Sequence, residues 1–290
     1  MLKSYCIAAR PKTLPAAVVP VWVGSVLAWH STGKFDLVLA LWTLCAAGAI
    51  QIATNFFNDA IDYQRGADTE ERLGPRRATA SGLLSQRAVY GGAYACLFVA
   101  CLCSIPLLQS RGWIIVLIGV PSLYLSYGYT GGPFPLAYLG LGELFVIIFF
   151  GLVAVGGSYL VQTGRWDWPA GVVGLQVGLL SALLISINNL RDVAEDKKSN
   201  KRTLVVRFGS VACGRMIAAF VITSVILSLF GLLYGAPWFV ALSIPWGLCG
   251  IICVKGVSSS PPGRAYNRFL AIAAVQLLLF ALLFSIAVFL

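Results

Sequence analysis

The chain contains 290 residues, of which 59% are hydrophobic and only 11% are charged, and its mean hydropathy is +0.85. Soluble globular proteins carry about 25% charged residues, so this chain has too little polar surface to enclose a core in water. The composition excludes a soluble enzyme, a disordered linker and a nucleic-acid-binding domain, despite the net charge of +10. It predicts an integral membrane protein.

Apolar stretches long enough to cross a bilayer recur along the whole chain. A helix needs about 20 mostly apolar residues to span the hydrocarbon core. Stretches of this kind predict nine membrane helices, near residues 14–30, 37–57, 88–108, 113–128, 137–161, 170–190, 211–233, 237–254 and 268–290. We therefore expect residues 1–290 to form a single domain, an all-α polytopic membrane bundle of about nine transmembrane helices.

The basic residues are distributed unevenly over the loops that nine spans create. The N-terminus and the second, sixth and eighth loops hold 18 of the 21 Lys and Arg residues, and the opposite face holds Lys34, Arg111 and Arg165. Cytoplasmic loops are enriched in Lys and Arg. This asymmetry predicts a cytoplasmic N-terminus, and a C-terminus on the opposite side of the cell (inner or plasma) membrane.

The acidic residues are concentrated in two polar segments on the same predicted face, near residues 58–87 and 191–210. These segments contain eight of the eleven Asp and Glu residues. Residues four apart on a helix lie on nearly the same face. This spacing brings together Asn58 and Asp62 in the first segment, and Asn188, Asp192 and Asp196 in the second. Each set lies at the cytoplasmic end of a predicted span, so we expect the active site there.

Carboxylates gathered on one helix face repel each other unless a cation lies among them. Oxygen ligands without His or Cys suit Mg²⁺, which usually bridges carboxylates to substrate phosphates. We therefore predict Mg²⁺ as the cofactor, with the ligands Asp59, Asp62, Asp68, Asp192 and Asp196. A shell of basic residues suits the charge of a bound diphosphate. Its members are Arg72, Arg76, Arg77, Lys197, Lys201 and Arg202.

Other interpretations of the two clusters are less favoured. A solvated loop would explain one cluster but not two matched clusters on one face. A transporter or channel would place its carboxylates near the membrane midplane rather than at one face. A phosphatidyltransferase that uses a CDP-alcohol also combines Mg²⁺ with carboxylates, but its opening Asp-Gly-x-x-Ala-Arg is absent from this sequence.

Several sequence blocks carry a resemblance to a known family. They are Arg10-Pro-Lys12-Thr, Asn58-Asp59-x-x-Asp62-x-x-x-Gly66-x-Asp68, Arg72-Leu-Gly-Pro75-Arg76, Leu139-Gly-Leu-Gly-Glu143, Phe149-Phe-Gly151, Asn188-Asn-Leu-Arg-Asp192 and Thr203-Leu-Val-Val-Arg207-Phe-Gly209. The chain resembles the UbiA superfamily of intramembrane aromatic prenyltransferases, and in particular its 1,4-dihydroxy-2-naphthoate branch. The last three predicted spans carry no distinctive motif.

The resemblance implies a bundle of nine helices around a central cavity. It also implies a Mg²⁺-dependent reaction, in which a polyprenyl group passes from polyprenyl diphosphate to 1,4-dihydroxy-2-naphthoate with loss of CO₂ and diphosphate. The product would be demethylmenaquinone, the precursor of menaquinone. Another aromatic acceptor, of the hydroxybenzoate or homogentisate type, remains an alternative. The expected partners are the two substrates and the lipid bilayer, without nucleic acid or an obligate protein partner.

The same hypothesis assigns roles to individual side chains. Residues expected to act in catalysis are Asn58, Asp62, Asn188 and Asp192. Residues expected to contact the substrates are Arg10, Lys12, Asn55, Arg72, Arg76, Arg77, Tyr129, Glu143, Lys197, Lys201 and Arg202. Arg10 and Lys12 would meet the acceptor carboxylate or the diphosphate. Tyr129 would face the allylic cation. Glu143 lies at the start of a span, where burying a charge is costly, so Glu143 is a candidate for a functional role.

Overall fold

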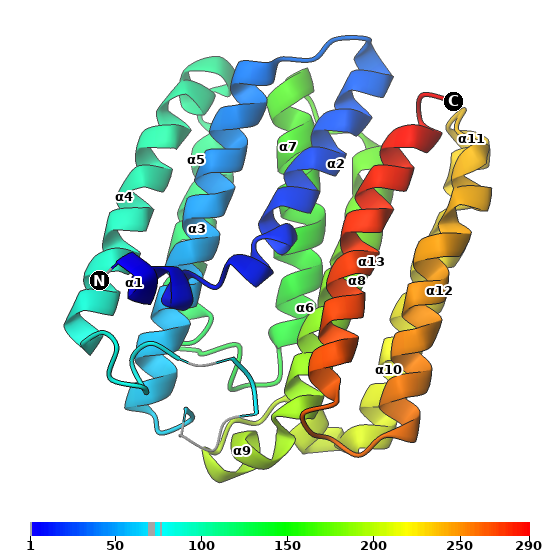
Figure 1. Cartoon of the computed structure of the whole chain (residues 1–290). Coiled ribbons are helices and arrows are strands. Elements are labelled where there is room, and N and C mark those ends of the chain that lie inside the picture. The colour runs from blue at the N-terminus through cyan, green and yellow to red at the C-terminus, as the bar shows by residue number, and fades with distance from the viewer. Residues whose placement is uncertain (1, 69–72, 76) are drawn as a thin grey trace.

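A computed structural model describes residues 2–68, 73–75 and 77–290, and in these residues all regular structure is helical (Figure 1). Arg72 and Arg76 lie outside the described residues. The first half contains α1 (Leu2–Ala9), the 3-10 turn η1 (Pro11–Thr13), α2 (Pro15–Thr32), α3 (Leu37–Gln64), α4 (Gln86–Arg111), α5 (Ile114–Gly128), α6 (Gly142–Val146), the π-helix η2 (Ile147–Val153) and α7 (Ala154–Thr163). The second half contains α8 (Trp168–Arg191), α9 (Val193–Lys198), α10 (Leu204–Leu227), α11 (Phe230–Leu233), α12 (Trp238–Ser259) and α13 (Tyr266–Ala287).

The predicted all-α membrane bundle is confirmed, and each of the nine apolar stretches falls on a helix. By length and composition, seven helical segments in the described residues are suited to crossing a membrane. The N-terminal helices form a bent pair, Leu2–Thr13 with Pro15–Thr32, that adds an eighth. The ninth stretch corresponds to α5, which is apolar but only 15 residues long. The predicted count of nine is therefore slightly high by this criterion.

The bend of 51° near the N-terminus has a local cause. Arg10 adopts a left-handed conformation (φ 51°) directly before Pro11. A proline disfavours helical geometry at the residue before it and has no backbone N–H to donate. The helix α1 therefore ends before Arg10, and the chain passes through η1 and Leu14 before α2 starts in a new direction.

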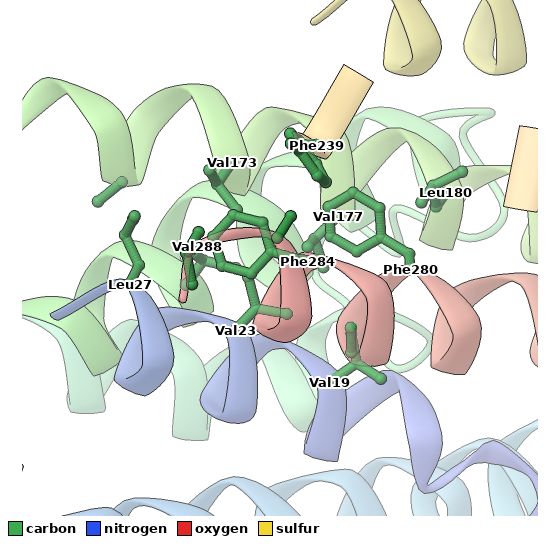
Figure 2. Close-up of a cluster of buried hydrophobic side chains, with 14 of the residues drawn as sticks. Val19, Val23, Leu27, Val173, Val177, Leu180, Phe239, Phe280, Phe284 and Val288 are labelled. Atoms are coloured by element: carbon green, nitrogen blue, oxygen red, sulfur yellow. The ribbon is translucent and has the colours of Figure 1, made fainter. Parts of the chain in front are cut away.

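The largest apolar core lies between α2, α8, α12 and α13 (Figure 2). Its members recur at helical spacing, and they include Val19, Val23, Leu27, Val173, Val177, Leu180, Phe239, Phe280, Phe284 and Val288. The rings of Phe239 and Phe284 meet edge to face with centroids 5.3 Å apart. In a membrane, close packing of this kind stabilises the association of helices, because lipid is as apolar as the side chains.

The helix α8 runs through the middle of the bundle, with 72% of its apolar window buried. It meets η2 at glycines. A Cβ atom on Gly151 would lie 2.4 Å from the carbonyl oxygen of Gly174, and one on Gly178 would lie 2.6 Å from that of Ile147. Only glycine permits this approach, so the Phe149-Phe-Gly151 block has a structural explanation.

The polar segments gather at one end of the bundle. The loop after α3 and the short helix α9 lie there, at the end opposite the C-terminus (Figure 1). The ends of α3 and α8 therefore carry their carboxylates to the same end, as the sequence predicted.

Candidate active site

The end of α3 supplies the first carboxylate of the site. Asp62 is buried, and its two oxygens accept from different donors: Nη2 of Arg77 at 3.0 Å and the hydroxyl of Tyr138 at 2.9 Å. One turn earlier, Asn58 accepts a hydrogen bond from the hydroxyl of Thr130. The predicted pair therefore does share a helix face, and both side chains are held by loop residues.

A glycine turn returns the chain to Asp62. Gly66 has φ +68°, which glycine adopts at low cost, and the amide of Ala67 donates to the carbonyl of Asp62 at 2.8 Å. The turn places Asp68 so that its Oδ2 lies 2.8 Å from Nε of Arg77. Arg77, only 6% exposed, thus bridges Asp62 and Asp68. This explains why these acids are six residues apart with a glycine between them.

Asp59 has a different environment from Asp62. It is fully buried, and its two oxygens accept from the backbone amides of Ala78 and Thr79 at 3.0 and 2.9 Å. It does not line the cavity between the two clusters. This geometry argues against the predicted metal-ligand role. Asp59 instead fixes the backbone that follows Arg77.

The end of α8 supplies the second set of carboxylates. The helix α8 ends at Arg191, and α9 begins at Val193 after Asp192, so the helix on which the four-residue spacing relies is interrupted at Asp192. The amide of Asp196 nevertheless donates to the carbonyl of Asp192 at 2.9 Å, which preserves the helical offset. Asn188, Asp192 and Asp196 consequently line one cavity, as predicted.

The sequence analysis missed the arginine behind this second set. Arg191 is 2% exposed and binds Asp192 through Nε and Nη2, at 2.6 and 2.7 Å. Its Nη2 also donates to Asn188 at 2.7 Å, and its Nη1 donates to Asn267 of α13 at 2.8 Å. Arg191 had been counted only among the residues that set membrane orientation. Its position directly before Asp192 could have indicated a contact with that carboxylate.

A polar cavity of about 120 Å³ separates the two clusters. It is lined by the acids Asp62, Asp68, Glu143, Asp192, Glu195 and Asp196, and by the cations Arg10, Arg77 and Lys201. Other predicted residues on its wall are Asn58, Tyr129 and Asn188. Residues that sequence reasoning missed on this wall include Thr130 and Asn189.

Several predicted substrate contacts lie elsewhere. Lys12, Lys197 and Arg202 are exposed and do not line the cavity. Asn55 is buried, and its amide donates to the carbonyl of Ala9 at 2.8 Å and to the hydroxyl of Thr13 at 2.9 Å. It therefore holds the bent N-terminal segment that carries Arg10, rather than reaching the cavity.

Two tyrosines at the cavity are held in the neutral state. Burial, followed by the charge of nearby carboxylates, raises the pKa of Tyr129 above its usual value. Burial and the adjacent Asp62 raise the pKa of Tyr138 in the same way. The hydroxyl of Tyr138 donates to Asp62, a contact that only the neutral phenol can make.

Glu143 lies at the start of α6 on the wall of the polar cavity and is 2% exposed. Its Oε1 accepts from Nδ2 of Asn189 at 2.9 Å. Its Oε2 is buried without a hydrogen-bond partner in the part of the chain that the structure describes. A buried carboxylate oxygen without a partner is costly, which indicates a ligand-binding function.

An apolar cavity of about 180 Å³ adjoins the polar one. Its wall comes from α2, α3, α4, α5 and the α6–η2–α7 segment, and it includes Phe145 and Phe149. The ring of Phe145 lies 4.9 Å from that of Tyr129 and 4.7 Å from that of Phe149, so the aromatic row leads from one cavity to the other. The site thus combines an ionic compartment with an apolar one.

The polar cavity is lined by the oxygen donors that Mg²⁺ prefers, although in the described residues no group of three or more His, Cys, Asp or Glu side chains could hold a metal ion as it stands. The carboxylates Asp62, Asp68, Asp192 and Asp196 face the cavity together with the amides of Asn58 and Asn188. This is a donor set of hard oxygens without sulfur or imidazole, which Mg²⁺ prefers. A carboxylate oxygen that already accepts from arginine keeps a second lone pair for a metal.

A membrane helix bundle with such a cavity beside an apolar one suits an intramembrane enzyme whose substrate has a charged head and an apolar tail. The model of the UbiA prenyltransferase family matches residues 17–280, and the chain therefore belongs to that family.

Individual relatives agree with this assignment. The 1,4-dihydroxy-2-naphthoate octaprenyltransferase of Haemophilus influenzae is 35% identical over 252 residues, covering 84% of this chain and 80% of the relative. The enzyme of the same name from Bacillus subtilis is 36% identical over 240 residues, covering 81% and 77%. A UbiA homolog from Archaeoglobus fulgidus, solved with DMAPP and Mg²⁺, has the same fold, with a TM-score of 0.68, 15% identity and 98% of each chain covered.

Proposed function

We propose that the protein transfers a polyprenyl group from polyprenyl diphosphate to 1,4-dihydroxy-2-naphthoate, with loss of CO₂ and diphosphate, to give demethylmenaquinol, the reduced form of demethylmenaquinone. Mg²⁺ is the proposed cofactor. The observation that carries the proposal is the meeting of the α3 and α8 carboxylates in one polar cavity, which adjoins an apolar cavity. The names of the Haemophilus and Bacillus relatives support the choice of acceptor.

The polar cavity is the proposed diphosphate site. Asp62 and Asp68 on one side, with Asp192 and Asp196 on the other, would hold Mg²⁺. When bound, the ion supplies Lewis-acid stabilisation of the negative charge on the departing diphosphate. Arg77 adds to it, because its buried Nη1 has no hydrogen-bond partner in the described residues and is available to a diphosphate oxygen.

The apolar cavity is the proposed site of the prenyl chain. The aromatic row of Tyr129, Phe145 and Phe149 lies where the chain would meet the diphosphate. Aromatic faces stabilise the positive charge that develops on the allylic carbon as the C–O bond breaks. Apolar walls keep water from capturing this carbon before the acceptor does.

The acceptor ring belongs beside Glu143 in this proposal. Its free Oε2 offers an acceptor to a ring hydroxyl, while Asn189 holds the other oxygen in place. Arg10, on the same cavity wall, offers a positive charge to the ring carboxylate. The electron-rich ring carbon attacks the allylic carbon directly, so the chemistry requires no protein nucleophile.

The site would face the cytoplasm of the cell (inner or plasma) membrane. This orientation is supported by the 18 of 21 basic residues that the nine predicted spans place on one face. Both substrates and the bilayer are the proposed partners.

Purified protein in detergent tests the proposal. Polyprenyl diphosphates of several lengths are incubated with 1,4-dihydroxy-2-naphthoate, with or without Mg²⁺, and products are identified by mass spectrometry. We expect a prenylated, decarboxylated naphthoquinol, and no product after chelation. Turnover only with hydroxybenzoate or homogentisate would move the enzyme to another branch. Liposome flux without any prenylated product would indicate a transporter instead.

A further inference from the structure

The last membrane helix begins beside the second carboxylate cluster. Tyr266, at its first turn, is almost fully buried, and its hydroxyl donates to the carbonyls of Val257 and Ser260 at 3.2 and 3.1 Å. Its ring belongs to the same buried cluster as Leu190 of α8. The next residue along the chain, Asn267, is therefore held against the end of α8, although no sequence motif marks this helix.

Asn267 completes the contacts of the buried Arg191. The Nε and Nη2 atoms of Arg191 bind Asp192, and its Nη2 also donates to Asn188. The remaining nitrogen, Nη1, donates to Oδ1 of Asn267 at 2.8 Å. Each nitrogen of this planar fork thus has an acceptor, so the guanidinium is fixed in one orientation. Arg191 does not line the cavity, which places it behind the side chains that do.

We propose that Asn267 is a positioning residue for the metal-binding carboxylates. It holds Arg191 in the orientation in which the guanidinium binds Asp192 and Asn188, and so fixes the position of these two side chains on the cavity wall. Partners of this kind orient metal ligands, and their loss typically costs about 10- to 100-fold in metal affinity. The inference rests on the proposed function, since it takes the cavity to hold Mg²⁺.

The Asn267 amide also makes a second contact, which allows its roles to be separated. Its Nδ2 donates to the carbonyl of Leu73 at 3.2 Å. The substitution Asn267→Asp keeps an oxygen for Arg191 but loses this donor. The substitution Asn267→Leu is similar in size and loses both contacts. Because Asn267 is exposed, neither change opens a cavity in the core.

The test measures Mg²⁺ binding independently of catalysis. Full-length protein in detergent is titrated with Mg²⁺, and the rise in Tm is recorded beside the Mg²⁺ dependence of turnover. We expect Asn267→Leu to need at least about tenfold more Mg²⁺ for half of the thermal shift, with a parallel change in turnover. We expect Asn267→Asp to stay within about threefold of the wild type, because the charge-assisted hydrogen bond to Arg191 is kept. The matched control, Arg268→Ala, changes an exposed neighbour and should leave both titrations unaltered.

A double-mutant cycle with Arg191→Lys guards against a purely structural effect. Lysine keeps the charge but lacks the fork, so this change alone should shift the Mg²⁺ midpoint, and adding Asn267→Leu should shift it little further. Additive shifts would overturn the proposal, as would a wild-type midpoint in Asn267→Leu or equal impairment in Asn267→Asp. A failure of the proposed function looks different: the wild-type protein itself would then show no Mg²⁺-dependent thermal shift or no prenylated product.

Discussion

Two buried arginines, Arg77 and Arg191, lie beside the two carboxylate clusters of the cavity and differ in how they are held. Arg77 comes from a loop, lines the cavity and keeps one nitrogen without a hydrogen-bond partner in the described residues. Arg191 ends α8, lies behind the cavity wall and has an acceptor for each nitrogen. Both arginines pair with the protein's own carboxylates, but only Arg77 also keeps a nitrogen available to a substrate.

The largest expected effects test whether the two carboxylate clusters bind Mg²⁺ together. We expect Asp62→Asn and Asp192→Asn each to lower turnover by about 1000-fold, because loss of one carboxylate removes several kcal/mol of stabilisation through the metal. Asparagine preserves size, so the protein should still be extracted as a monodisperse species. Turnover within tenfold of the wild type in either variant would show that the clusters do not act together.

Replacing the arginines tests how they differ. With saturating Mg²⁺, we expect Arg77→Ala to raise the KM for polyprenyl diphosphate by about 50-fold, which corresponds to the loss of one charge-assisted hydrogen bond. We expect Arg191→Ala to destabilise the fold by about 3–5 kcal/mol, since a buried carboxylate loses its partner. Steady-state kinetics measure the change in KM, and thermal unfolding measures the loss of stability. Arg77→Ala should also lower Tm, because Asp62 and Asp68 lose their partner, so the distinction rests on the KM: an unchanged diphosphate KM in Arg77→Ala, or an equal rise in Arg191→Ala, would contradict it.

Asp59 provides a sharper test within the first cluster. In Asp59→Asn, one oxygen still accepts a backbone amide while the other contact is lost. We expect turnover to fall by about tenfold, the cost of one buried unsatisfied donor, with an unchanged Mg²⁺ midpoint. A raised Mg²⁺ midpoint would restore Asp59 as a metal ligand and remove the positioning role that we assign to it.

The smallest effect separates two basic residues of the N-terminal segment. Arg10 lines the cavity, whereas Lys12 is exposed and lies off it. We expect Lys12→Ala to change the KM of the acceptor by less than about twofold, as is usual for surface positions. Arg10→Ala should raise it by about tenfold, through loss of a charge-assisted hydrogen bond. The reverse order would restore the acceptor contact predicted for Lys12 from the sequence.

The sequence predicted features that depend on local spacing. The interval of four residues placed Asn58 with Asp62, and Asn188 with Asp192, because helical periodicity alone decides which side chains share a face. The four-residue spacing also holds beyond the end of α8 at Arg191, because the hydrogen bond from the Asp196 amide to the Asp192 carbonyl keeps these two residues in a helical arrangement.

Features that depend on distant segments were not predictable in this way. The partners of Asp59 lie about 20 residues away, and the contact between Arg191 and Asn267 spans 76 residues. Nothing in a single sequence distinguishes a buried arginine from one that anchors the chain at the membrane surface, since both follow an apolar helix. The Asn267 contact depends on how α13 packs against α8, which apolar periodicity does not specify.

The junction between the ionic and apolar cavities has a consequence for how the proposed reaction ends. Both substrates carry the anionic groups that such a polar cavity retains, a diphosphate on one and a carboxylate on the other. The reaction removes both of them. The remaining molecule is a neutral lipid that keeps its ring hydroxyls but has lost both anionic groups, and its tail already lies among apolar side chains. The reaction itself therefore converts two tightly held substrates into a lipid product that partitions into the surrounding bilayer.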